Sequence, residues 1–400
     1  MERNILIFAS HLEKIEQMKK AIAALAIIAA LIAAILMFSS RFKVTEHIYV
    51  EWNGERVGIR GEGSAGLKWT IDGGYLTMTA NETVGKSLKI HLSGECANGQ
   101  FELTAAKRTF VLLEGLKLLN PTDAALVLKG TKPTYLNLAD NTENTLGDAG
   151  ITASGDLTIG GDGSLTIVAQ GTGHKGINID GNLKIKDDPT ITITTSGQPE
   201  HMHVLPQSVW LGKGPGLPRI PQDSSNLSNF SNPSNPSEPS LLPLPPPGFE
   251  RYDFSGTTKA IKAQGTILIE GGTITLSTCT PGAEGLESKR DIIINGGTLN
   301  VEAYDDAINA LMTMTVNGGI VNAVSSHNDG IDINGGQLKP WATSIPKNFD
   351  SQRAKELEGQ PTYYQTGGSV TARTTAGFPE EGLDTDNAPI SHTGGELVTY

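Results

Sequence analysis

The stretch Asp305–Gly336, DDAINALMTMTVNGGIVNAVSSHNDGIDINGG, contains one short pattern twice. Asp306 and Asp329 are each followed by a small residue, an aliphatic residue and a second polar residue. In a strand, this order places the aliphatic side chain on the inner face and the polar side chains on the outer face. The same pattern begins at Ala149, Lys175, Lys259, Glu284 and Glu381. We therefore expect a repeated unit in which one strand carries this motif.

Glycine pairs mark a second strand of the unit. They precede the strand-like segments TITL, TLNV, IVNA, SVTA and ELVT, at Gly271-Gly272, Gly296-Gly297, Gly318-Gly319, Gly367-Gly368 and Gly394-Gly395. The first three pairs lie about 25 and 22 residues apart. A unit of this length, built from strands and turns without a helix, is typical of a parallel β-helix, whereas a propeller blade is about twice as long. The sequence therefore predicts an all-β, single-stranded parallel β-helix.

Composition limits the class of partner. The 400 residues include 47 glycines, which indicates many turns, and the net charge is −12. Nucleic acid is an unfavourable partner for such a chain, because phosphate binding draws on clustered basic side chains. Cys96 and Cys279 have no zinc-binding spacing.

The N-terminal region is expected to direct export. The apolar stretch Ala21–Phe38 is about long enough to cross a bilayer, and Lys14, Lys19 and Lys20 precede it. We expect residues 1–42 to be an N-terminal extension with either a cleaved signal peptide or a membrane-anchoring hydrophobic helix. Residues 43–400 would then be exported as the β-helix, to the periplasm, the cell surface or the medium, with membrane contact only through the N-terminal segment.

Two segments interrupt the repeats. Residues 197–256 are rich in Pro, Ser and Asn and are expected to form a loop extruded from one coil. Residues 338–365 are expected to form a second loop with a short helix. Long loops on solenoids often form the binding surface, and aromatic rings stack on sugars. Trp341, Tyr363 and Tyr364 are therefore candidates for carbohydrate binding; the alternative is that they cap or pad the solenoid.

Stacking of the motif creates a column of carboxylates. Adjacent parallel strands lie about 4.8 Å apart, so Glu284, Asp306 and Asp329 are expected at about that separation. Like charges at this distance repel, and Ca²⁺ would compensate because it accepts oxygen ligands in loose geometry. The alternative is that these acids are ordinary solvated turn residues.

The segments LTIGGDGSLTIV, GLESKRDIIINGGTLNVEA and DGIDINGG resemble the secreted bacterial carbohydrate-binding β-helix family, which binds cellulose and acidic sugars such as polygalacturonate. The resemblance implies a right-handed parallel β-helix similar to pectate lyases, with Ca²⁺ on the carboxylates of successive coils. Carried over by position, the metal ligands are Glu284, Glu287, Asp305, Asp306, Asn309, Asp329, Asp332, Glu381 and Asp384.

The sequence departs from that family in three places. Early coils have Ala149, Lys175 and Lys259 at the acidic position, so metal is expected in the later coils. The glycine pair follows much sooner after Asp329 than after Asp306, so we expect Asp332 to lie out of register. The sequence ends at GGELVTY without an obvious cap, and an uncovered strand edge favours self-association at this coil.

Three functions fit these features. The leading prediction is an exported, non-catalytic polysaccharide-binding protein with bound Ca²⁺ and no catalytic residues. A calcium-dependent lyase on the same fold would need a basic residue to abstract a proton. The candidates would be Lys259, Lys262, Lys289 and Arg290, none of which repeats in a distinctive pattern. The third possibility is an adhesin-like solenoid whose ligand is another protein, because the fold alone does not decide function.

Overall fold

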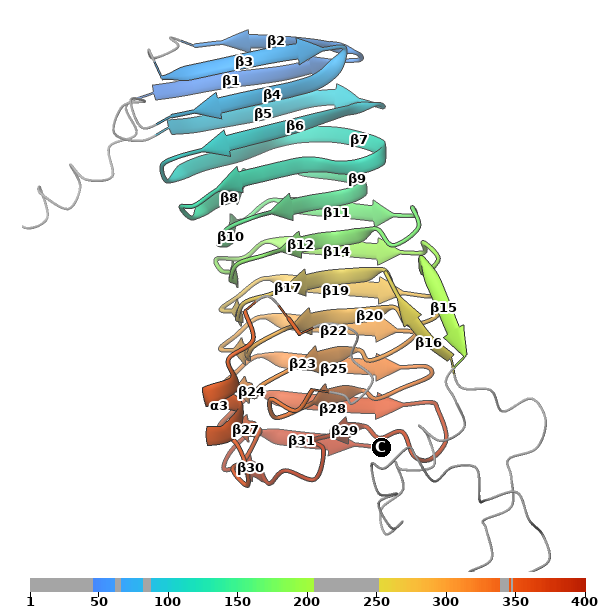
Figure 1. Cartoon of the computed structure of the whole chain (residues 1–400). Coiled ribbons are helices and arrows are strands. Elements are labelled where there is room, and N and C mark those ends of the chain that lie inside the picture. Colours follow the sequence, from blue (N-terminus) through green and yellow to red (C-terminus); the bar gives the residue numbers. More distant parts are fainter. Residues whose placement is uncertain (1–45, 62–65, 82–87, 205–251, 339–344, 347) are drawn as a thin grey trace, which may run out of the picture.

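The structure is a computed structural model that describes residues 46–61, 66–81, 88–204, 252–338, 345–346 and 348–400. The predicted apolar segment 21–38 lies outside these ranges, as does Trp341. In the part of the chain that is described, no helix is long and apolar enough to span a bilayer. The described chain is almost entirely β-strand and forms one parallel β-solenoid (Figure 1).

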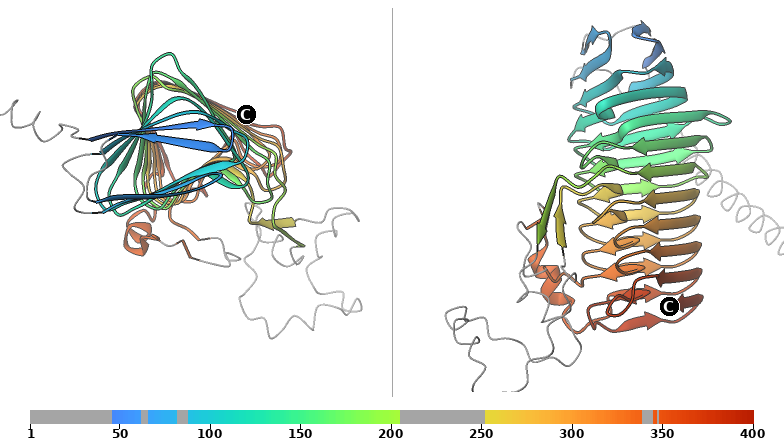
Figure 2. Two further views of the ribbon diagram at one scale, coloured as in Figure 1. Left: turned by 90° about the horizontal axis from the view of Figure 1, so that it is seen from above. Right: turned by 90° about the vertical axis from the view of Figure 1, so that its right-hand side faces the viewer.

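Successive coils stack their strands into three columns, which enclose a common core (Figure 2). The first column contains β1 (Glu46–Asn53), β5 (Leu88–Cys96), the start of β7 (Thr109–Gly130), β8 (Thr134–Leu138), β10 (Leu157–Gly161), β13 (Leu183–Ile185), β18 (Ile267–Ile269), β21 (Ile292–Ile294), β24 (Met314–Val316), β27 (Tyr363–Gln365) and β30 (Ile390–His392). The second contains the start of β9 (Glu143–Ala153), β11 (Ser164–Ala169), β14 (Thr190–Thr195), β19 (Thr273–Thr278), β22 (Thr298–Ala303), β25 (Ile320–Ser325), β28 (Ser369–Thr374) and β31 (Glu396–Thr399). The third contains β4 (Gly74–Ala80), β6 (Gly99–Ala105), the ends of β7 and β9, β12 (Lys175–Ile179), β17 (Lys259–Ala263), β20 (Glu284–Ser288), β23 (Ile308–Ala310), β26 (Ile331–Ile333) and β29 (Leu383–Asp384).

The core is a stack of inward-facing aliphatic side chains. In the third column, Ile261, Leu286, Ile308 and Ile331 lie in register on successive strands, and each is fully buried. Burying one such side chain contributes about 1.5–3 kcal/mol. Because a single coil has no layer of its own to pack against, this stabilisation exists only when neighbouring coils are stacked.

The glycine pairs form the turns that lead into the second column. The second glycine of each pair has a positive φ, for example +81° at Gly297 and +84° at Gly319. A Cβ atom at Gly297 would lie 2.6 Å from the carbonyl oxygen of Gly272 in the preceding coil. Both the backbone angle and the close approach therefore require glycine.

The N-terminal end of the solenoid has antiparallel neighbours. β2 (Arg56–Arg60) pairs antiparallel with β1, and β3 (Leu67–Asp72) pairs antiparallel with β4. At the other end, β29, β30 and β31 form the last described coil, each pairing with the strand before it in its column. Self-association at this edge stays a prediction.

Two short strands flank the Pro-rich insert. β15 (His201–Val204) pairs antiparallel with β16 (Tyr252–Ser255) at its base (Figure 1). Across the insert, β12 pairs directly with β17 and β14 with β19. The stacking of coils therefore continues without a gap.

A second excursion follows β26. The chain returns to the solenoid at β27, which pairs directly with β24. In between it forms the short helix α3 (Ser351–Glu356), whose N-terminus is capped by the Asp350 side chain accepting the Arg353 N–H. Residues 348–356, which we call the returning segment, lie beside earlier coils (Figure 1, orange).

Candidate functional site: a buried carboxylate cluster on the third column

The repeated motif forms one column of polar side chains on the third column of strands. Glu287 lies opposite Asn309, Asn309 opposite Asp332, and Asp332 opposite Asp384. The expectation that Asp332 lies out of register is wrong. The shortened spacing after Asp329 reflects the excursion that begins after β26, and the motif strand itself keeps its place in the stack.

Three predicted metal ligands converge in this column. Asp306, Asp329 and Asp332 each have a carboxylate oxygen within 4.8 Å of an oxygen of the other two, and all three side chains are buried. Asp306 precedes β23, Asp329 precedes β26, and Asp332 lies within β26. Two neighbouring coils thus supply the whole group, which we call the carboxylate cluster.

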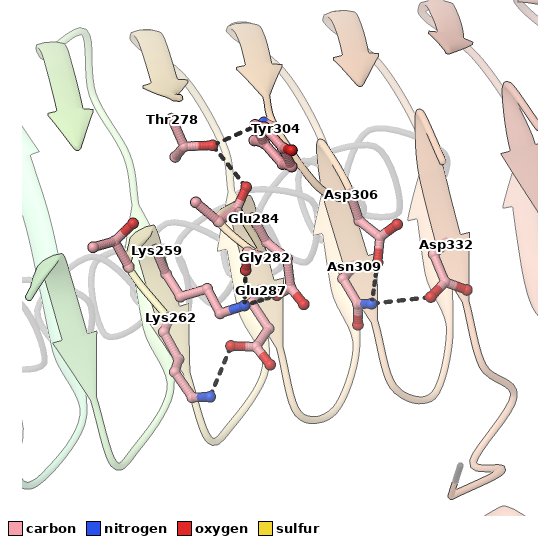
Figure 3. Close-up of polar contacts among 12 residues, drawn as sticks. Lys259, Lys262, Thr278, Gly282, Glu284, Glu287, Tyr304, Asp306, Asn309 and Asp332 are labelled. Atoms are coloured by element: carbon pink, nitrogen blue, oxygen red, sulfur yellow. Dashed lines mark hydrogen bonds and ion pairs between the residues drawn. The ribbon is translucent and has the colours of Figure 1, made fainter. Parts of the chain in front are cut away.

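Amide groups hold the carboxylate cluster together. The Asn309 Nδ2 donates to Asp306 Oδ2 at 2.9 Å and to Asp332 Oδ2 at 3.1 Å (Figure 3). The Asn334 Nδ2 donates to both oxygens of Asp332, at 2.9 and 3.0 Å. The peptide N–H of Glu381 donates to Asp329 Oδ1 at 2.7 Å. These donors fix the carboxylate orientations, and they are neutral, so they leave the negative charge in place.

The environment of the carboxylate cluster raises the pKa of Asp329. Burial raises the pKa of Asp329 to about 8, and the nearby carboxylates of Asp332, Asp384 and Glu380 raise it further, against the opposing effect of the Glu381 N–H bond. A carboxyl group at this position therefore holds a proton near neutral pH unless a cation replaces that proton.

Glu284 and Glu287, also predicted to bind metal, do not join the carboxylate cluster. Lys259 Nζ lies 3.0 Å from Glu284 Oε2, and Lys262 Nζ lies 2.8 Å from Glu287 Oε2. Lys289 forms a second ion pair with Glu287. Figure 3 shows the lysines beside the two glutamates, and Asp306, Asn309 and Asp332 on the coils beyond. Lysine ammonium groups therefore neutralise this part of the column.

The two glutamates and three lysines form an ion-pair network, in which the pKa values of Glu284 and Glu287 shift in opposite directions. Burial alone would raise the pKa of Glu287, but Lys289, Lys262 and Lys259 together hold it well below its usual range. Burial and the neighbouring Glu287 raise the pKa of Glu284. The pKa values of Lys259 and Lys289 are raised, because their glutamate partners outweigh the effect of burial. Both lysines therefore stay charged and are poor proton acceptors.

The remaining predicted ligands lie at the edge of the carboxylate cluster. Asp305 is half-buried, and its carbonyl oxygen accepts a hydrogen bond from Ser325 Oγ at 2.7 Å. The Glu381 side chain is exposed. Asp384 is half-buried and accepts the Asp386 N–H at 2.8 Å. None of these three belongs to the converging group.

The predicted aromatic platform is not formed as expected. Tyr363 is fully buried, and its hydroxyl donates to Gln365 Oε1 at 2.9 Å, so its assignment as a carbohydrate-binding residue is wrong. Tyr364 is half-buried on the first column, away from the carboxylate cluster. Trp341 lies outside the described residues.

Sequence reasoning missed an aromatic group beside the carboxylate cluster. Tyr304 and His327 stack with ring centroids 3.8 Å apart and planes 4° apart. They occupy equivalent turns of adjacent coils, each just before a cluster aspartate. Phe378, 83% exposed, lies in the corresponding turn of the next coil. The equivalent position of Tyr304 and His327, two residues before Asp306 and Asp329, was the available signal.

Comparisons with known proteins identify the family of this chain. No curated protein matches the chain. A solved structure, described as the polysaccharide lyase-like protein from C. thermocellum (gadolinium derivative), is 18% identical, with a TM-score of 0.44, covering 72% of this chain and 92% of that one. A family model described as carbohydrate-binding domain-containing protein matches residues 72–200 and 251–330, more than half of the chain, on both sides of the Pro-rich insert. The chain therefore belongs to the family of carbohydrate-binding domain-containing proteins.

Proposed function

We propose that this protein is a non-catalytic binding protein for acidic polysaccharide, such as polygalacturonate, and that Asp306, Asp329 and Asp332 hold a Ca²⁺ ion that takes part in binding. The observation that carries the proposal is the convergence of these three buried carboxylates on one column. Cellulose, the other ligand class suggested by the sequence, lacks the carboxylates that a bound cation would recognise.

The oxygen donors suit a hard divalent cation. Ca²⁺ takes six to eight oxygen ligands in flexible geometry, mostly from carboxylates, carbonyls and water. Three carboxylates binding through one oxygen each leave several positions for water or for a ligand. Burial, with a smaller contribution from the nearby carboxylates, raises the pKa of Asp329, and a bound cation would stabilise its ionised form. A bound Ca²⁺ would neutralise that charge and attract uronate carboxylates.

The neighbouring aromatic side chains support a sugar ligand. Tyr304 and His327 lie in the turns directly before the carboxylate cluster, where a glycan bound to the metal would pass. Aromatic faces offer sugar rings an apolar contact, and the tyrosine hydroxyl adds a polar one.

Lysine chemistry disfavours a lyase. A proton-abstracting base near the metal must be able to lose its own proton. Lys259 and Lys289 have raised pKa values, and Arg290 pairs with Asp350 at 3.4 Å. Burial and the nearby Lys262 lower the pKa of Lys175, but that residue lies three coils before Asp306, about 14 Å along the column. This separation is too large for both groups to act on one sugar residue.

Export is part of the proposal. The apolar stretch 21–38 would carry the β-solenoid out of the cytoplasm, as a signal peptide or as an anchor. Both a polysaccharide ligand and a site that binds Ca²⁺ weakly fit an extracellular location.

The first test is titration of polygalacturonate into the full chain by calorimetry, with Ca²⁺ and with EGTA. We expect binding only with Ca²⁺. Asp306→Asn should bind polygalacturonate at least about tenfold more weakly than the unaltered protein, because one metal ligand loses its charge. Glu302→Gln, an exposed change in the adjacent β22, is the control and should leave affinity unchanged. Binding that persists in EGTA and in Asp306→Asn would refute the metal assignment, and an ultraviolet-absorbing product would indicate a lyase.

Tyr304→Ala should weaken polygalacturonate binding several-fold while leaving Ca²⁺ binding unchanged. The half-buried ring stacks on His327, so its loss removes apolar contact with the sugar and no metal ligand. Separate titrations with Ca²⁺ alone and with polygalacturonate at saturating Ca²⁺ measure the two effects. Tyr304→Phe keeps the ring and should retain most of the affinity. Equal affinity for Tyr304→Ala and the unaltered protein would exclude this turn from the glycan site.

A further inference from the structure

The returning segment is fixed against the corner where the third column turns into the first. Asn348 Nδ2 donates to the Asp180 carbonyl oxygen at 3.1 Å. Asp350 pairs with Arg290, and Arg353 donates to Asp291 Oδ1 at 2.8 Å. These contacts join the segment to turns of two coils, because Arg290 and Asp291 lie in the same turn between β20 and β21. The segment is therefore a fixed wall beside the solenoid (Figure 1).

A cleft of about 630 Å³ lies between this wall and the corner. Its floor is formed by equivalent turns of successive coils, including Asp156, Asn182 and Arg290. Gly181 and Gly265 also line it, and they place backbone rather than side chain at the surface of the floor. The volume falls within the range of about 300–1,000 Å³ that is usual for small-molecule sites.

The floor is held by its own hydrogen bonds. Asp156 Oδ1 accepts both the peptide N–H and the Nδ2 of Asn182, at 2.8 and 3.0 Å. Asn182 Oδ1 in turn accepts the Thr266 N–H of the next coil at 2.9 Å. This ladder fixes the polar side chains before any ligand arrives, which lowers the entropic cost of binding.

The lining has little net charge. Arg290 is offset by Asp350 within the cleft, and Asp156 is the remaining carboxylate among the residues that line it. The other lining side chains are uncharged, and they include the amides of Asn348 and Gln352 and one aromatic residue, Phe349. Amides match sugar hydroxyls as donors and acceptors, and an aromatic ring matches the apolar face of a sugar. A polyanion would meet the carboxylate of Asp156 here, with Arg290 already paired to Asp350.

We propose that this cleft binds a short segment of an uncharged oligosaccharide, independently of Ca²⁺ and of the carboxylate cluster. The proposal takes carbohydrate as the ligand class from the proposed function, but it uses a different corner of the coil and different side chains. The protein would then contact one glycan, or two glycans of different charge, at two places on the same solenoid.

The test is calorimetric titration of the full chain in EGTA with cellohexaose, xylohexaose and mannohexaose, and with hexagalacturonate as the charged comparison. We expect at least one uncharged hexaose to bind and hexagalacturonate to bind at least about tenfold more weakly. Phe349→Ala should weaken the uncharged ligand about tenfold, and Phe349→Tyr should retain it. Phe110→Ala is the matched control, because that ring is also half-buried and lies outside the cleft, and the affinity of this variant should be unchanged.

Thermal melts of each variant show whether a loss of affinity comes from a lost ligand contact or from displacement of the returning segment. Phe349 is half-buried, so we expect Phe349→Ala to melt close to the unaltered protein while losing affinity. Gln352→Ala, an exposed change on the same wall of the cleft, should also weaken binding without a change in melting. No binding of any uncharged hexaose in EGTA, or equal binding by Phe349→Ala, would overturn the proposal. Because this titration contains no free Ca²⁺, its failure leaves the Ca²⁺-dependent polygalacturonate test unaffected, and the reverse also holds.

Discussion

Lys259→Ala is expected to lower the free energy of unfolding by about 3–5 kcal/mol. Lys259 is only 6% exposed, and its Nζ contacts both Glu284 Oε2 and the carbonyl oxygen of Gly282, at 3.0 and 3.2 Å. Removing the ammonium group leaves a buried carboxylate without its partner, next to a second negative charge on Glu287. The loss should be smaller at pH 5 than at pH 8, because Glu284 can then take up a proton.

Urea denaturation of the variant, monitored by circular dichroism, measures this loss. The matched control is Lys184→Ala, which removes an exposed ion pair to Glu270 with a similar distance of 2.8 Å and should cost no more than about 1 kcal/mol. The double variant Lys259→Met with Glu284→Leu should recover most of the stability, because apolar residues replace a buried ion pair at little cost. Equal losses for Lys259→Ala and Lys184→Ala would show that the ion-pair network contributes no more than a surface pair.

The stacking of the coils was predictable from the sequence because it depends on backbone repetition. Glycine is required wherever the turn demands a positive φ, as at Gly297 and Gly319, so the glycine pairs mark the coil period directly. The inward aliphatic residue of each motif marks the register, and Ile308 and Ile331 are paired as the alignment predicted. Only at Asp332 did spacing mislead, since an excursion after the strand changes the spacing without changing the register.

The separation of the acidic column into an ion-pair network and a carboxylate cluster was less predictable, because it depends on how far long side chains reach. Lys259 was recognised as a departure from the acidic pattern and Lys262 only as a candidate base. A one-dimensional alignment does not show that both extend toward the next coil and pair with Glu284 and Glu287. Similarly, Tyr363 lies in a segment that reads as a loop, yet it begins the strand β27 and faces the core. The contacts of the returning segment join residues far apart in sequence, such as Asn348 and Asp180, and no repeat pattern encodes them.

The largest pH effect is expected at Asp329 in the absence of metal. Its pKa is about 8 in the folded protein and 3.8 for an unperturbed side chain, so the folded state binds the proton more tightly than the unfolded state does. Between pH 4 and pH 8, therefore, rising pH removes stability, with a slope approaching about 1.4 kcal/mol per pH unit and a total of several kcal/mol. Below pH 4 both states are protonated and the effect is constant. Ca²⁺ should reverse the trend, because it binds the ionised carboxylate and so stabilises the folded state most at pH 8.

Thermal and urea melts of the full chain from pH 4 to pH 9, with EGTA and with Ca²⁺, measure this dependence against Asp329→Asn. The asparagine can still accept the Glu381 N–H, but it carries no charge at any pH. In EGTA the variant should match the unaltered protein near pH 4 and exceed its stability at pH 8, and its response to Ca²⁺ should be lost. Asp140→Asn, an exposed change in a distant turn, controls for the general loss of one negative charge and should preserve both responses. If Asp329→Asn is less stable than the unaltered protein at pH 8 in EGTA, the carboxylate cluster does not carry the repulsion that a cation would relieve, and the case for Ca²⁺ at these three aspartates fails.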